Sequence, residues 1–181
     1  MKRFFMIFIC VMMNVSLFAQ EDIYGVKVTQ SGNFYKATLD RKSDNGGSVS
    51  ESWSGTLING RREGTWKFSG KYNLYGPNNS VFWTGNVTIV KNYKNGIPHG
   101  VYQVTDNLNV RGGGYNVFTG QWVYRQPQSE NATITGSFEN GKMSGTWNVN
   151  AKHTKFVATF NNGMPNGKFS YTDENGLTTT A

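Results

Sequence analysis

The Asn-Gly dipeptide constrains this chain more than any other sequence feature. It occurs seven times in 181 residues, beginning at positions 45, 59, 95, 140, 162, 166 and 175. Both residues tolerate the positive φ angles of a tight hairpin turn, which makes Asn-Gly the strongest short signal for a β-hairpin. Beyond the N-terminal segment, the apolar residues do not follow the i, i+3, i+4, i+7 spacing of an amphipathic helix. We therefore expect a chain of strands that reverses direction repeatedly.

The apolar residues between these dipeptides alternate with polar ones. Trp53 and Leu57 precede one turn, and Trp66 and Phe68 follow it. A period of two is typical of half-buried strands. The prediction is an all-β fold, an antiparallel sheet of consecutive β-hairpins. Its turns are expected at Asn59-Gly60, Asn95-Gly96, Asn140-Gly141 and Asn162-Gly163.

An internal repeat surrounds these turns. Residues 55–68 and 136–149 share the pattern Gly-x-Φ-x-Asn-Gly-x-x-x-Gly-Thr-Trp-x-Φ, where Φ is apolar, and looser copies lie at 93–102 and 160–169. The aromatic residue after the second glycine, Trp66 or Trp147 in the full copies, is expected to be an internal staple, meaning a buried ring that holds neighbouring hairpins together. The turns are 36, 45 and 22 residues apart. If 22 is the basic unit, the longer steps contain a degenerate copy or an inserted hairpin, and residues 82–87 and 117–122 favour the inserted hairpin.

The Asn-Gly-x-x-x-Gly turn followed by an aromatic strand resembles the MORN repeat, especially the variant arrays of bacterial proteins. The resemblance covers about residues 53–176, and His99 lies where MORN units often carry a histidine. It implies hairpins laid side by side, so that stability accumulates along the array. It implies no single activity, because the family includes scaffolds, membrane-associated proteins and enzymes with appended repeats.

The first 19 residues have the composition of a secretory signal peptide. A basic start, Met1-Lys2-Arg3, precedes an apolar run over residues 4–18, and Ala19 is a small residue suited to cleavage. The run is shorter than the roughly 20 apolar residues of a spanning helix. Removing 19 of 181 residues leaves 162, with 16 basic and 11 acidic side chains and a net charge of +5. We expect one exported domain over residues 20–181, periplasmic, outer-surface or secreted.

The mature sequence contains little that points to catalysis. The only cysteine, Cys10, lies inside the predicted signal, so disulfides, a lipid anchor and a thiol nucleophile are not expected. His99 and His153 are the only histidines, and neither they nor the scattered acids have the spacing of a metal site or a carboxylate pair. Gly112–Gly114 lack the residues of a phosphate-binding loop and are interpreted as a hairpin tip. No catalytic, metal or cofactor-binding residue is predicted.

The charge distribution restricts the class of partner. The basic residues are spread along the chain, which argues against a nucleic-acid partner. The positive balance suits an anionic envelope surface or a polysaccharide, and it leaves association with a membrane surface open without an anchor.

Aromatic residues outside the repeat positions are the candidate partner-binding residues. They are Trp83, Trp122 and Tyr124, with Arg125 beside them. Exposed aromatic rings stack on sugars or anchor protein partners. The alternative is that these rings cover a sheet face or the N-terminal hairpin.

Two functions follow from this reading. The preferred one is an exported, non-enzymatic binding or scaffold protein that engages a protein, a glycan or an envelope component. The alternative is an enzyme or enzyme subunit acting on envelope or extracellular glycans, which would require a cleft with two converging carboxylates. The oligomeric state is left open.

The aromatic hypothesis generates a first prediction. Replacing Trp83 and Trp122 together with Ala is expected to leave the melting transition nearly unchanged and to abolish binding to glycan-array hits or to a co-purified partner. Unfolding of the double variant would instead identify the two rings as core.

Overall fold

The chain forms strands throughout the part that the structure describes. The computed structural model describes residues 26–42, 46–75, 81–116, 121–124, 128–152 and 154–180, so the predicted signal peptide and His153 lie outside it. The strands are β1 (Val26–Ser31), β2 (Phe34–Lys42), β3 (Ser48–Ile58), β4 (Arg61–Tyr75), β5 (Val81–Lys94), β6 (Ile97–Asn116), β7 (Gln121–Tyr124), β8 (Gln128–Glu139), β9 (Lys142–Ala151), β10 (Thr154–Asn161), β11 (Met164–Thr172) and β12 (Thr178–Thr180).

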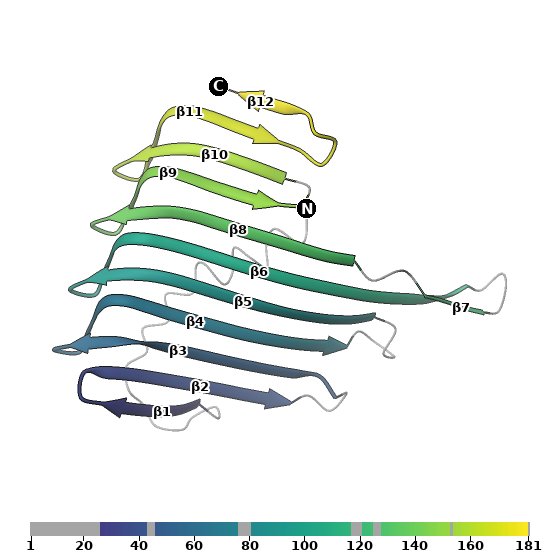
Figure 1. Ribbon diagram of the computed structural model, residues 1–181, viewed down its shortest axis with the longest axis horizontal. Coiled ribbons are helices and arrows are strands. Elements are labelled where there is room, and N and C mark those ends of the chain that lie inside the picture. The colour runs from purple at the N-terminus through teal and green to yellow at the C-terminus, as the bar shows by residue number, and fades with distance from the viewer. Residues whose placement is uncertain are drawn as a thin grey trace.

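These strands form one antiparallel sheet in nearly sequential order. The order is β1-β2-β3-β4-β5-β6-β8-β9-β10-β11-β12, and β7 pairs with β6 off this path. Figure 1 shows the strands side by side in a twisted array, with β7 beyond the far end of β8. The predicted all-β array of antiparallel hairpins is confirmed.

The four predicted turns lie along one edge of the sheet. They join β3 to β4, β5 to β6, β8 to β9 and β10 to β11 (Figure 1). In each turn the Asn has a φ of 49 to 54° and the following Gly a φ of 72 to 83°. Two consecutive positive φ angles define a type I′ turn, whose twist matches that of the strands it joins. The predicted turn positions are confirmed.

The second glycine of the motif has a separate function. Gly64, Gly100, Gly145 and Gly167 have positive φ angles of 64 to 99°. Each hairpin has a register shift at this level of the sheet. Such β-bulges accommodate an extra residue and increase the local twist. The repeat therefore encodes a type I′ turn and a bulge a few residues after it.

Successive turns are hydrogen-bonded to one another through the backbone. In each case the amide of the turn glycine donates to the carbonyl of the third residue after the preceding turn's Asn. The pairs are Gly96 to Arg62 at 2.8 Å, Gly141 to Pro98 at 2.8 Å and Gly163 to Met143 at 2.9 Å. The end of the sheet that carries the Asn-Gly turns is thus held together by a regular series of backbone hydrogen bonds between successive hairpins.

Side chains extend this series in two places. The Asn95 amide donates to Glu63 Oε2 at 2.7 Å, and the Asn140 amide donates to His99 Nδ1 at 3.5 Å. Glu63 and His99 both lie four residues after a turn Asn, so they occupy equivalent repeat positions. His99 therefore contacts the next turn from the position that Glu63 occupies in its own unit.

The repeat tryptophans lie flat on glycines of the neighbouring strand. A Cβ at Gly55 would overlap the Trp66 ring, and a Cβ at Gly136 would overlap the Trp147 ring. Each indole Nε1 donates to the carbonyl of the residue after that glycine, at 3.0 Å and 3.2 Å respectively. Only 8% of Trp66 and 6% of Trp147 is exposed. The expectation that both are internal staples is confirmed.

The buried apolar residues form two clusters on the same sheet face. One contains Tyr35 and Trp66 with ring centroids 6.0 Å apart, and the other contains Tyr102 and Trp147 at 5.4 Å. Every substantial contact between described strands is between hydrogen-bonded neighbours. In the described chain, burial therefore comes from rings lying on their own sheet, with no second layer of strands or helices.

The spacing between turns reflects strand length as well as insertion. The 36-residue step contains β4 and β5, strands of 15 and 14 residues that pair directly, and no extra repeat. The prediction of a degenerate copy or inserted hairpin is wrong there. In the 45-residue step, β7 folds back on the end of β6 over Gly113–Asn116, which is an inserted hairpin.

Two glycine-containing segments differ from their sequence interpretation. Gly112–Gly114 lie within β6, where Gly113 pairs with Tyr124, so the prediction of a hairpin tip is wrong. Glycine is compatible with a strand whose partner approaches closely. Asn166-Gly167 lies within β11 and supplies the bulge glycine instead of a turn.

The stacking of tryptophan on glycine generates a prediction. Gly136→Ala is expected to destabilise the protein by about 1–3 kcal/mol, because the new methyl group meets the Trp147 ring. Trp147→Ala should cost about 3–5 kcal/mol. Urea melts of each variant would measure these free energies.

A double variant tests the coupling between the two positions. The fourth repeat pairs Ala158 with Phe169 at the equivalent positions. Gly136→Ala combined with Trp147→Phe is therefore expected to lose less stability than the sum of the two single changes. Strict additivity would contradict the proposed packing.

Candidate functional site

Alternation along the strands divides the sheet into two chemically different faces. The apolar face has a continuous cross-strand row formed by Ala37, Trp53, Phe68, Ile89, Val104, Ile134, Val149 and Phe156. The opposite face has a matching row formed by Thr38, Ser52, Ser69, Thr88, Thr105, Thr133 and Asn150. Each face is a candidate interaction surface.

Two cations lie among aromatic rings on the apolar face. Arg62 Cζ is 4.9 Å from the Trp66 ring centroid, and its Nη1 donates to the Tyr93 hydroxyl at 3.1 Å. Lys91 Nζ is 4.9 Å from the Phe138 centroid and 5.5 Å from that of Tyr93. Cations at these distances are attracted to the ring faces. We call these residues, together with Tyr102, the cation–aromatic cluster.

Lys91 occupies a position that is glycine in the full repeats. It lies four residues before the turn Asn, as Gly55 and Gly136 do in their units. It pairs directly with Tyr102, and its Nζ is 5.8 Å from that ring's centroid. Sequence reasoning missed this residue, although the departure from glycine at an aligned repeat position was the available signal.

Burial perturbs two ionisable groups on the apolar face. Desolvation lowers the pKa of Lys91, and the nearby Arg62 charge lowers it further. Desolvation also raises the pKa of Asp106, which lies in β6 between Val87 and Ala132. In both groups the charged form is the one that burial disfavours.

The opposite face contains a field of hydroxyl and amide side chains, which we call the hydroxyl–amide face. On β5, β6 and β8 its polar members are Thr84, Asn86, Thr88, Gln103, Thr105, Asn107, Asn109, Ser129, Asn131, Thr133 and Thr135. Val90 and the exposed Val101 lie on the same face, nearer the Asn-Gly turns. Exposed Lys36, Lys67 and Lys71 lie on the same face over β2 and β4. The face is therefore neutral in its centre and carries charged residues on both sides, with Asp40 beside the lysines on β2 and Lys155 on β10.

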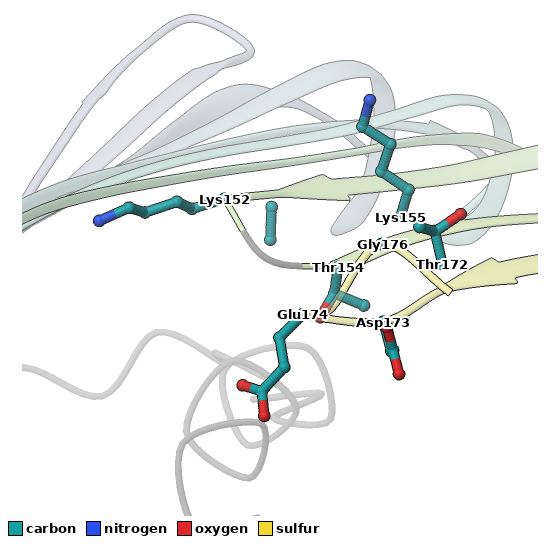
Figure 2. Close-up of a pocket in the computed structure, with 8 residues that line it drawn as sticks. Lys152, Thr154, Lys155, Thr172, Asp173, Glu174 and Gly176 are labelled. Carbon is teal, nitrogen blue, oxygen red and sulfur yellow. The ribbon is translucent and has the colours of Figure 1, made fainter. Parts of the chain in front are cut away.

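A hollow of about 330 Å³ lies where the β9–β10 and β11–β12 connections meet. Figure 2 shows Lys152 and Lys155 extending away from each other, with Asp173 and Glu174 pointing to another side. Asp173 Oδ1 also accepts two backbone amides of its own loop, each at 2.9 Å. The charged groups do not converge, so the hollow lacks the geometry of an acid–base pair.

The predicted partner-binding residues lie toward the far end of the long strands. Trp83 is half-buried and pairs with Leu74 and Val110. Trp122 and Tyr124 are in β7, opposite Tyr115 and Gly113. Along β6, Tyr115 is five residues beyond Val110, roughly 17 Å at the rise of a strand. Arg125 lies outside the described residues, so the assignment of these four residues stays a prediction.

Within the described ranges, the His, Cys, Asp and Glu side chains form no group of three or more that could hold a metal ion. No helix in that part of the chain is long and apolar enough to span a membrane. Comparisons with protein-family models, curated proteins and solved structures found no match. The resemblance to MORN repeats therefore stays a prediction.

The cation–aromatic cluster generates a pKa prediction. Arg62→Met removes the neighbouring charge and is expected to raise the pKa of Lys91 toward its ordinary value. Part of the depression should remain, because burial is its larger cause. NMR titration of the Lys91 side chain would measure the change, with the exposed Arg61→Met as matched control. An unchanged pKa in Arg62→Met would contradict the cluster geometry.

Proposed function

We propose that this is an exported, non-enzymatic binding protein whose hydroxyl–amide face engages an extended, anionic or hydroxyl-rich glycan. The observation that carries the proposal is the aligned polar field on β5, β6 and β8, centred on Thr88, Thr105 and Thr133. Adjacent strands lie about 4.8 Å apart, so the side chains of this row repeat at that interval.

The chemistry of the face matches that of a sugar polymer. Hydroxyl and amide groups donate and accept hydrogen bonds, as sugar hydroxyls do. Each bond contributes only about 0.5–1.5 kcal/mol net, so useful affinity requires many of them over an extended ligand. Lys67 and Lys71 on β4 border the field, and Lys36 lies two strands further out on β2. These positive charges favour a polymer that carries negative charge.

A glycan-processing enzyme is less well supported. Hydrolysis of a glycosidic bond requires two carboxyl groups flanking that bond. The adjacent carboxylates of the hollow do not meet this requirement, because Asp173 caps its own loop. Trp83 lies on the other, apolar face, in line with Val87 and Ile89, so a site at Trp83 would be separate from this one. An exported scaffold that binds protein through that face is compatible with glycan binding by the hydroxyl–amide face.

Removing three central hydroxyls tests the proposal. Thr88→Val, Thr105→Val and Thr133→Val in one chain preserve side-chain shape and strand propensity. We expect an unchanged fold by circular dichroism and at least about tenfold weaker binding. The loss of three hydrogen bonds should cost more than the roughly 1.4 kcal/mol of binding free energy that corresponds to a tenfold change. Glycan arrays and co-sedimentation with acidic polysaccharides would measure binding.

The matched control replaces three threonines outside the β5–β6–β8 field with Val: Thr29 on β1, Thr159 on β10 and Thr180 on β12. This variant is expected to bind like the wild type. Equal binding by both triple variants, or no binding of any polysaccharide by the wild type, would contradict the assignment of this face.

A further inference from the structure

The apolar face has a regular distribution of large and small side chains on either side of its central row. The first group, which we call the bulky row, is displaced from the central row by two residues along each strand toward the Asn-Gly turns. It contains Trp66, Lys91, Tyr102 and Trp147. The second group, which we call the small row, is displaced by two residues in the opposite direction and contains Val87, Asp106, Ala132 and Ala151. The bulky row also contains the Lys91 cation. The small row contains the Asp106 carboxylate and continues through Gly70 on β4 to Glu51 on β3, whose carboxylate accepts a hydrogen bond from the Tyr72 hydroxyl.

We propose that the apolar face packs against the same face of a second copy of this chain, with the two-fold axis along the central row. This rotation keeps the strand order and reverses strand direction, so each bulky row faces the partner's small row. On β6 Tyr102 then faces Asp106, and on β9 Trp147 faces Ala151. Two-fold interfaces require a self-complementary surface of this kind.

Charge complementarity supports the same orientation. On β5, Lys91 faces Val87 of the second copy, and Asp106 is the register neighbour of Val87, one strand spacing of about 4.8 Å away. The ammonium of each copy therefore reaches the carboxylate of the other at two symmetric places. Each group is desolvated in the single chain without gaining an opposite charge among its cross-strand neighbours.

The other face-to-face arrangement is unfavourable. A two-fold axis parallel to the strands through β6 would stack bulky row on bulky row. It would also place Asp106 directly opposite Asp106 of the second copy. Like charges that meet in a desolvated interface cost free energy, so the distribution of side chains selects one orientation of the two.

The available area is sufficient for a stable dimer. The contact would cover the seven strands β3–β6 and β8–β10, which are spaced about 4.8 Å apart. If about eight residues of each strand take part, at about 3.3 Å per residue, the covered area is about 900 Å² per copy. A typical stable interface buries about 800 Å² per partner. The product is a two-layer sandwich with sheets about 10 Å apart and both hydroxyl–amide faces outward. The dimer is independent of glycan binding by those faces.

Sedimentation equilibrium of the purified protein, with charge-reversal variants, tests the interface. The wild type is expected to be dimeric at micromolar concentration. Lys91→Glu and Asp106→Lys should each weaken dimerisation at least about tenfold, and the two changes in one chain should restore it. The matched control is Lys67→Glu, an exposed charge reversal on the opposite face, which should dimerise normally.

Zero-length carbodiimide crosslinking of the wild type provides a test without substitution. Mass spectrometry of the crosslinked dimer should detect a linkage between Lys91 of one copy and Asp106 of the other. Within one chain these residues are separated by one strand spacing laterally and about 13 Å along the strands, which is too far for this reagent. A wild type that stays monomeric, a dimer without this linkage, or a double variant that fails to restore dimerisation would each overturn the proposal.

Discussion

The register of the hairpins is the constraint on which the rest of this structure depends. Side chains alternate along a strand, so a slip of one residue would exchange the apolar and polar faces. Each Asn-Gly turn with its bulge glycine sets the offset between two strands, and the Gly96-to-Arg62 bond and its equivalents set the offset between hairpins. The cross-strand rows exist because both offsets are maintained from β3 to β11.

A single-layer sheet has to bury its aromatic rings without a second layer. In this chain, Trp66 and Trp147 lie over Gly55 and Gly136, where the missing side chain leaves room for an indole ring. The fourth unit pairs Ala158 with Phe169, so alanine replaces the smaller glycine and phenylalanine replaces the larger tryptophan. The second unit replaces the glycine with Lys91, whose chain lies along the apolar surface while its ammonium contacts the rings. A packing position has thereby become a charged one.

The two faces of the sheet are suited to two different kinds of contact. The apolar face has paired bulky and small rows that fit a second copy, whereas the hydroxyl–amide face presents hydrogen-bonding groups suited to a hydrated ligand. A sandwich would bury the first kind of surface and display the second on both outer sides. Two weak polysaccharide-binding faces in one particle would then act together, because the second contact becomes intramolecular.

The sequence by itself determined the all-β class, the four type I′ turn positions and the tryptophan staples. These are local properties, since Asn and Gly tolerate positive φ and alternation reports strand faces. It did not determine that Gly112–Gly114 continue a strand or that β4 and β5 pair directly, because strand length depends on the partner that extends beside it. Only the tertiary structure aligned Lys91, Asp106 and the threonine row across strands. Those alignments depend on register between residues far apart in the chain, and neither composition nor local spacing contains that information.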